Sequence, residues 1–296
     1  MERVYKQTTA YYDETLTPIA CVNSGETISF HSPDCWGNNL NSSITKDELY
    51  KKGLEMNPCC GPVWINNSEV GDTLKIHIDD IQVKNGHLAI YRKEFGVLGD
   101  YLSKDETIDV SIQNGIASLY NGLFRWTIKP MLGVLAVTPK GEKQSTLLSG
   151  KYGGNMDCKL LRKGTTLYLP VQVPGALLIT GDVHALQGDG EVLASLEVPA
   201  EIKLTVDVIK NKSEQWPILE TEDAWYVITS ALTSSDANTI SLSAMADFVT
   251  TRGIYTPLQW LTIMGLRGNS QNCKVVDKYK TSRFMMPKDV MGTFKF

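Results

Sequence analysis

The sequence predicts a mainly β protein, built from several β subdomains of the sandwich or jelly-roll kind plus a small barrel, with a C-terminal α+β unit. Residues 74–79 and 202–208 alternate between apolar and polar side chains, which is the period-two pattern of half-buried antiparallel strands. Glycine- and proline-containing turn signals recur through the first 210 residues, as in sandwiches and barrels. Helical spacing of apolar residues begins only in the last third of the chain.

A hairpin is predicted in the first half of the chain. The strand-like segments 72–83 and 87–93 are separated by Asn85-Gly86, the dipeptide that best supplies two positive φ values to a two-residue turn. We therefore expect these two strands to pair with each other.

Two helices are predicted after residue 213. Leu242, Met245 and Val249 have helical spacing before Arg252-Gly253, a pattern that ends a helix. The run 256–259 then offers a threonine N-cap, a proline at the first helical position and a glutamine two residues later. Strand-like segments on either side of the helices complete a small α+β unit.

The composition excludes several classes of partner. The 296 residues carry a formal net charge of −4, with lysine and arginine scattered singly, so no basic stripe is available for nucleic acid or an anionic membrane surface. No apolar run approaches the roughly 18 residues that span a bilayer. The six cysteines form no C-x₂-C pair and no signal-like segment begins the chain, so the sequence predicts a reduced, cytoplasmic protein.

Candidate functional side chains are concentrated between residues 181 and 197, where four carboxylates and one histidine interrupt an otherwise apolar stretch. Buried carboxylates require compensation by a cation or by donors, and a metal ion is the simplest compensation. On an extended strand Asp182 and His184 face the same side, whereas Val183 faces the core. The glycine-rich turn that follows could present either Asp189 or Glu191 to a small ligand.

Two other segments could contribute to this site. Asp34 lies in a loop where an Asx turn is the ordinary role of an aspartate, and His31 nearby stays open as a ligand. In 152–157, Gly153-Gly154 frees backbone N–H groups that could face an oxyanion, although a plain turn explains the glycines equally well. Motifs of zincins, α/β-hydrolases, dinucleotide-binding proteins and P-loop NTPases are absent from the sequence, and Leu186 excludes an EF-hand loop.

The sequence resembles the acetamidase/formamidase family over nearly its whole length. The resemblance rests on GGNMD at 153–157, LPV at 169–171, GALL at 175–178 and above all on GD-x-HA-x-QGDGE at 181–191. Many members have a histidine where this chain has Tyr152. The resemblance implies a cytoplasmic hydrolase that converts short amides to carboxylate and ammonia, contains bound zinc or calcium, and forms a homodimer or higher homo-oligomer.

The residues and the resemblance together give a predicted site. Its metal, zinc in the first place and calcium as the alternative, would be bound by Asp34, Asp157, Asp182 and His184. Catalysis would involve Glu191 or Asp189 as the base, with Asn155, and the substrate would contact Gly153, Gly154, Gln187 and Glu197. Cys35 and Cys158 are expected to be replaceable, with no role as nucleophile.

A different class of function stays open at this point. The same cluster could be a structural calcium site in a non-catalytic β-sandwich module that binds a small polar ligand. The two differ in coordination, because a catalytic metal keeps one position open.

The predicted site also constrains the domain organisation. Asp34 can reach residues 157–191 only if the N-terminal strands pack beside the strands of 150–210. We therefore expect residues 1–55 and 150–212 to form the sandwich that carries the site, residues 56–149 to form an inserted barrel-like subdomain, and residues 213–296 to form the α+β unit.

Overall fold

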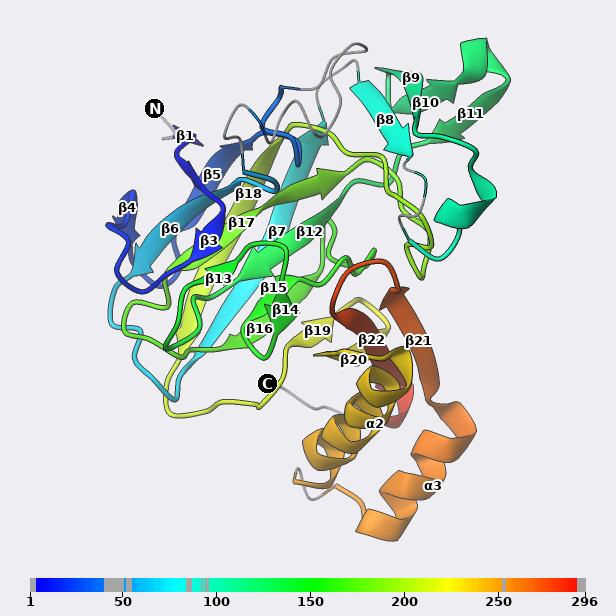
Figure 1. Ribbon diagram of the computed structural model, residues 1–296. Helices are drawn as coiled ribbons and strands as arrows, with labels where there is room; N and C mark the ends of the chain where they lie inside the picture. Colours follow the sequence, from blue (N-terminus) through cyan, green and yellow to red (C-terminus); the bar gives the residue numbers. More distant parts are fainter. Residues whose placement is uncertain are drawn as a thin grey trace.

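A computed structural model describes residues 4–39, 51, 55–83, 87–91, 93, 96–251 and 254–291. The protein is mainly β, as predicted, and its body consists of two large sheets (Figure 1). Their facing sides share one apolar core, to which Ile76 and Leu204 contribute from one sheet and Leu132 and Val183 from the other. The predicted alternation of residues 74–79 is confirmed, since Leu74, Ile76 and Ile78 are fully buried.

The first large sheet has nine strands. In spatial order they are β1 (Val4–Tyr5), β5 (Thr27–Ser32), β18 (Ala200–Ile209), β7 (Thr73–Val83), β16 (Thr166–Pro170), β19 (Ile218–Glu220), β20 (Ala224–Ala231), β22 (Lys280–Pro287) and β21 (Asn269–Lys274). Pairing of β5 with β18 sets the N-terminal strands beside the 200–209 strand, as the predicted site requires.

The second large sheet has seven strands. They are β14 (Ser149–Gly150), β15 (Gly153–Asn155), β12 (Met131–Ala136), β17 (Leu178–His184), β6 (Cys59–Ile65) and β2 (Thr8–Thr9), with β4 (Ala20–Val22) also paired to β6. A separate two-stranded sheet joins β3 (Tyr11–Tyr12) to β13 (Gln144–Ser145). The central strand β17 supplies Asp182 and His184 to the candidate site described below, and Gly133 of its neighbour β12 packs against the site.

A four-stranded sheet projects from the body (Figure 1). Its strands are β8 (His87–Tyr91), β9 (Glu106–Gln113), β10 (Ile116–Leu119) and β11 (Phe124–Thr127), and the short 3₁₀ turns Gly99–Tyr101 and Tyr120–Gly122 precede β9 and β11. The predicted hairpin between 72–83 and 87–93 is wrong, because β8 pairs with β9 while β7 belongs to the nine-stranded sheet. β18 occupies one edge of β7 along its length and β16 occupies part of the other. The turn residues Asn85 and Gly86 lie outside the described residues.

The predicted three-part division stays a proposal, and the strand pairing shows which of its segments share a sheet. Among the described residues of 56–149, β8 to β11 form a sheet of their own, whereas β6, β7 and β12 pair with strands of the two large sheets. The C-terminal strands β19 to β22 extend the nine-stranded sheet.

Both predicted helices are present and pack on this C-terminal part of the sheet (Figure 1). Helix α2 (Ser234–Thr250) begins after Thr233, and α3 (Pro257–Arg267) has the predicted capping box between Thr256 and Gln259. Trp260 is fully buried in a second apolar core that α2, α3 and the strands share. A last 3₁₀ turn, Lys288–Val290, follows β22.

Two further features concern the environment of the protein. In the part of the chain that the structure describes, no helix is long and apolar enough to cross a membrane. All six cysteines are free thiols, and five of them are buried.

A buried aspartate, Asp72, ties the turn before β7 to the end of β18. Its carboxylate accepts from Lys210 Nζ at 2.6 Å and from the backbone N–H groups of Asn211 and Glu69 at 2.9 and 2.8 Å. Burial alone would raise the pKa of Asp72, but these donors outweigh it and hold the pKa below its usual value. The stabilisation is therefore present above the unfolded-state pKa and disappears as the pH falls through the lowered folded-state pKa.

We expect Asp72→Asn to lower the free energy of unfolding by about 1–2 kcal/mol at neutral pH, because charge-assisted bonds to a buried acceptor are lost. The difference from the wild type should shrink below about pH 4 in urea titrations. Asp207→Asn is the matched control, since its ion pair with Lys75 is over one third exposed on both sides and should contribute little. A constant difference at all pH values would contradict the electrostatic explanation.

Candidate active site

A small cavity of about 90 Å³ lies beside the C-terminal end of β17. The side chains that border it come from β15, β17, the loops after β5, β13, β15 and β17, and the segment after β21. They are Cys35, Trp36, Met56, Asn57, Leu147, Asn155, Asp157, Asp182, His184, Glu191, Ala194, Ser195, Glu197, Val276 and Asp277. Six predicted site residues of the 181–197 and 153–157 segments are thus accompanied by residues from distant parts of the chain.

His184 is at the centre of this cluster. Its Nε2 lies 3.0 Å from Glu197 Oε1, 3.6 Å from Asp182 Oδ1 and 4.0 Å from Asp157 Oδ1, and the imidazole is 1% exposed. Val183 between the two ligand candidates belongs to the main core, so the predicted alternation along this strand is confirmed. One strand therefore brings an imidazole and a carboxylate to the same point.

Gln187 determines which ring nitrogen of His184 carries the proton. Its Nε2 donates to the backbone oxygens of Asp157 at 2.6 Å and Cys273 at 3.4 Å, so its Oε1 faces His184 Nδ1 at 2.7 Å. An amide oxygen only accepts, and Nδ1 must therefore be the protonated nitrogen. The Nε2 atom of a neutral His184 then directs a lone pair at three carboxylates, an arrangement that requires a proton or a metal ion at that position.

The electrostatics of the cluster favour a cation among these side chains. Burial lowers the pKa of His184, but Glu197 and Asp182 outweigh it and raise the pKa well above its usual value. Burial raises the pKa of Glu197 to about 7, although His184 opposes the shift. Burial and the charge of Asp157 raise the pKa of Glu191 well above its usual value. The raised pKa values of Glu191 and Glu197 reflect the cost of burying several carboxylates together.

The side chains present fit a divalent metal ion. Among the titratable side chains of the cavity, four buried atoms lack a hydrogen-bond partner in the described part of the chain: Asp157 Oδ1, His184 Nε2, Glu191 Oε2 and Glu197 Oε2. Ligand atoms come within 4.8 Å of one another in two adjacent groups, Asp157 with His184 and Glu191, and Cys35 with Asp182 and Glu197. A mixture of nitrogen, oxygen and sulfur ligands suits zinc, whereas calcium prefers oxygen alone.

Backbone strain collects at the same residues. Asp157, Asp182 and Glu191 have positive φ angles of 45°, 55° and 36°, a region that non-glycine residues rarely adopt. Such strain persists where the surrounding structure enforces it, typically at functional sites. Gly133 of β12 is part of that enforcement, because a Cβ added there would overlap with the carboxylates of both Asp157 and Asp182.

Two of the predicted residues have other partners. Asp34 Oδ1 accepts from the backbone N–H groups of Trp36 and Asn38 at 2.9 and 2.8 Å, which is the Asx-turn role, and Asp34 does not border the cavity. Asp189 forms ion pairs with Lys159 at 2.6 Å and Arg283 at 2.8 Å and also lies outside the cavity. Of the two carboxylates offered by the 187–191 turn, Glu191 is the one that faces the cluster.

The double glycine has a structural explanation. Gly153 and Gly154 have φ angles of 87° and 90°, pair with β12, and approach the backbone oxygens of Leu135 and Leu148 too closely for a Cβ. Neither glycine borders the cavity, so their predicted contact with the substrate has no support in the geometry. Their neighbour Asn155 does border it.

Sequence reasoning missed several polar residues of the site, among them Cys35, Asn57, Ser195, Lys274 and Asp277. Lys274 is fully buried, and its Nζ contacts Asp157 Oδ2 at 2.9 Å and Asp277 Oδ2 at 2.7 Å. Ser195 Oγ donates to Glu191 Oε1 at 2.8 Å. No spacing relates these residues to 181–191. Cys35 alone had a signal, its position next to Asp34, but a lone cysteine in a loop did not distinguish it.

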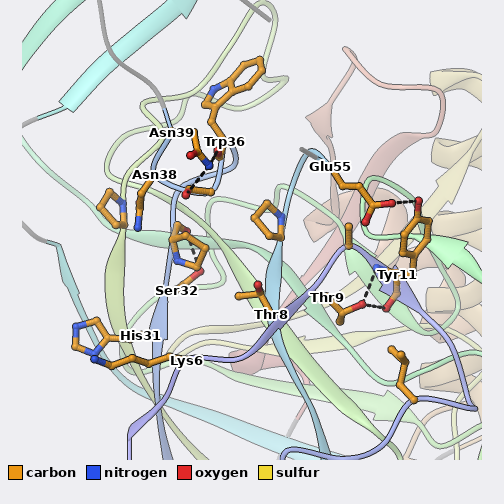
Figure 2. A pocket seen from close by; sticks show the side chains of 16 residues that line it. Lys6, Thr8, Thr9, Tyr11, His31, Ser32, Trp36, Asn38, Asn39 and Glu55 are labelled. Carbon is orange, nitrogen blue, oxygen red and sulfur yellow. Dashed lines mark hydrogen bonds between the residues drawn. The ribbon is translucent and has the colours of Figure 1, made fainter. Parts of the chain in front are cut away.

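A wider hollow of about 940 Å³ lies next to the cavity, and Trp36 borders both. Figure 2 shows Lys6 and His31 on one side of this hollow and Tyr11 and Glu55 on the opposite side. Tyr11 donates a hydrogen bond to Glu55. His31 Nε2 lies 3.0 Å from Glu201 Oε1, and His31 borders the hollow instead of the small cavity. The possibility that His31 is a ligand of the cluster therefore has no support.

Comparison with known proteins shows the family of this chain. The profile of the Acetamidase/Formamidase family matches residues 3–146 and 140–272. The chain belongs to this family. The predicted resemblance is thus confirmed, over most of the chain.

Solved acetamidases have the same fold. The Bacillus halodurans acetamidase is 30% identical, with a TM-score of 0.92 over 97% of this chain and 98% of that one. A protein of Thermoanaerobacter tengcongensis named as a predicted acetamidase/formamidase is 31% identical, with a TM-score of 0.92 over 98% and 97%. A Schizosaccharomyces pombe protein named as a formamidase is 24% identical over 250 residues, 64% of this chain and 61% of that protein. The match thus spans less than two thirds of that relative's length.

Proposed function

We propose that this member of the acetamidase/formamidase family is a metal-dependent amidohydrolase that cleaves short linear amides to a carboxylate and ammonia. The observation that carries the proposal is the lone pair of His184 Nε2, fixed by Gln187 and directed at buried carboxylates. The small volume of the cavity, about 90 Å³, favours amides of the size of formamide and acetamide.

The ligands of the metal would come from the two groups around His184. We infer zinc, held by His184 with Asp157 and Asp182 and with Glu197 or Cys35 in reach, in place of the Asp34 predicted from the sequence. When bound, the ion would supply Lewis acidity toward the amide carbonyl and increase the acidity of a water molecule. Cys35 is a thiol in the free protein, because burial and the charges of Glu197 and Asp182 raise its pKa well above the usual value.

Glu191 is the proposed proton carrier. Ser195 holds its Oε1, and its Oε2 is buried without a hydrogen-bond partner among the described residues. A carboxylate with a raised pKa, as burial and Asp157 give Glu191, is a stronger base than an ordinary one, and once protonated it can donate that proton again. Glu191 would take the proton of the attacking water and transfer it to the amide nitrogen, so that ammonia leaves as the C–N bond breaks.

Metal removal tests the proposal. We expect purified protein to release ammonia from formamide and acetamide, dialysis against a chelator to abolish the release, and zinc to restore it. Elemental analysis of the same samples gives the metal identity and number. Full activity in protein shown to be free of metal would refute the metal dependence. Bound metal without ammonia release from any short amide would favour the binding module with a structural ion.

The assembly and location of the protein belong to the same proposal. The resemblance supports a homodimer or higher homo-oligomer, which light scattering of the purified protein measures directly. Six free cysteines support a reducing compartment such as the cytoplasm.

A further inference from the structure

We propose that the side-chain oxygen of Asn155 binds the N–H₂ group of the substrate and so makes the site specific for primary amides. The inference rests on the proposed function, and it assigns to one neutral side chain the recognition of the nitrogen that leaves.

The orientation of Asn155 follows from its partners. Its Nδ2 donates to Asp277 Oδ2 at 3.1 Å, and a carboxylate oxygen accepts only, so the amide group cannot be reversed without loss of this bond. Asp277 is in turn fixed by Lys274 Nζ at 2.7 Å. The chain of contacts from Lys274 through Asp277 therefore leaves Asn155 Oδ1 on the opposite side of the amide group.

This oxygen is an acceptor without a donor. Asn155 is 3% exposed and borders the cavity, and its Oδ1 is buried with no hydrogen-bond partner among the described residues. Asn57 has the same properties: it is 2% exposed, borders the same cavity, and has a buried Oδ1 without a partner in the described part of the chain. A buried acceptor without a partner costs free energy, and it regains that energy when a ligand donates to it.

The chemistry of the proposed substrate matches these acceptors. A primary amide presents two N–H donors and one carbonyl oxygen, whereas a ketone or an ester of the same size presents no N–H. Among the described lining residues, Asn57 and Asn155 are the two that offer a neutral amide oxygen, whereas Ser195 Oγ donates to Glu191 and the carboxylate of Asp277 is paired with Lys274. A site built to accept an N–H rejects analogues that lack it, because its buried oxygen then stays unpaired.

Acetone is the matched probe, since it has the size and carbonyl of acetamide with a methyl group in place of the N–H₂ group. We expect Asn155→Leu, which keeps the approximate shape, to lower kcat/KM for acetamide about 10- to 100-fold. The inhibition constant of acetone should stay within about 2-fold of the wild type, and the metal content should not change. Asn269→Ala, a replacement on an exposed strand residue, is the control.

A second variant keeps the test valid if Asn155→Leu does not fold. Asp277→Ala removes the acceptor that orients Asn155 and should reduce the preference for acetamide over acetone in the same direction, by about 2- to 10-fold. Equal changes for acetamide and acetone would overturn the proposal and indicate a packing role. Loss of metal from Asn155→Leu would also overturn it and make Asn155 a ligand.

The outcome is separable from that of the proposed function. If the wild type hydrolyses no short amide, the proposed function fails, and binding of acetamide and acetone is then compared by ligand-observed NMR. Preference of the wild type for acetamide, abolished in Asn155→Leu, would still support the inference, whereas equal binding would refute it.

Discussion

Glu191→Gln is expected to lower kcat for acetamide by roughly 10²- to 10⁴-fold while the metal content stays that of the wild type. Glutamine keeps the shape of the side chain and can still accept from Ser195 Oγ, the bond that orients Glu191 in the wild type. It cannot accept the proton of the attacking water or return it to the nitrogen. Steady-state kinetics of ammonia release, with elemental analysis of the same preparation, measures both quantities.

Asp189→Asn is the matched control for this experiment. Asp189 lies two residues from Glu191 in the same turn, but its carboxylate pairs with Lys159 and Arg283 and does not border the cavity. The variant should keep most of its activity, although the loss of a partner for the buried Arg283 should lower its stability. Loss of metal from Glu191→Gln would contradict the assignment and make Glu191 a ligand, since it lies in one of the two ligand groups.

What the sequence could predict was decided by local chemistry. The alternation of residues 74–79, the same-side placement of Asp182 and His184, and the capping box of Thr256 and Gln259 depend on neighbours within four residues, and all three are confirmed. The helix over 234–250 is of the same kind. Periodicity and capping are properties of a segment, so they can be inferred without knowledge of its partners.

Predictions failed where tertiary pairing competed with a local signal. Asn85-Gly86 favours a hairpin, but strand β7 pairs with β16 and β18, which come from later parts of the chain. Gly153-Gly154 suggested an anion site, but close approach of two backbones accounts for both glycines. In each case the burial of a strand between others determined the structure, and no local pattern reports that burial.

Only part of the candidate site could be predicted from the sequence, and the reason is related. Residues 153–157 and 181–197 are close in sequence and carry the acidic cluster, whereas Lys274 and Asp277 come from the C-terminal part of the chain. Lys274, at the end of β21 of the nine-stranded sheet, reaches Asp157, which follows β15 of the seven-stranded sheet, and Asp277 contacts Lys274 and Asn155. In the loop after β5, Asp34 was the predicted ligand, but its side chain caps the backbone. The next residue, Cys35, is the one that faces Asp182 and Glu197. Side-chain direction in an irregular loop has no sequence period.

His184→Ala is expected to lower the metal occupancy of the purified protein sharply and to abolish ammonia release. The imidazole is the one nitrogen donor in the two ligand groups of the described residues, and it lies within 4.0 Å of Asp157, Asp182 and Glu197. Loss of a mere partner of a ligand typically costs about 10- to 100-fold in metal affinity, so loss of a ligand should cost at least as much. Titration of the metal-free variant with zinc measures the change.

The thermal stability of this variant separates a ligand from an ordinary buried histidine. Metal that binds only the folded protein raises its melting temperature, so zinc should stabilise the wild type strongly and His184→Ala weakly. A packing defect would instead lower the melting temperatures of the metal-free and metal-loaded variant equally. His77→Ala is the matched control, because His77 contacts Thr166 on the nine-stranded sheet and does not border the cavity, so the variant should respond to zinc as the wild type does. If His184→Ala kept its metal, its activity and its response to zinc, His184 would not be a metal ligand. Its Nε2 would then carry a proton in the wild type, and the surrounding carboxylates would be stabilised by an imidazolium in place of a metal ion.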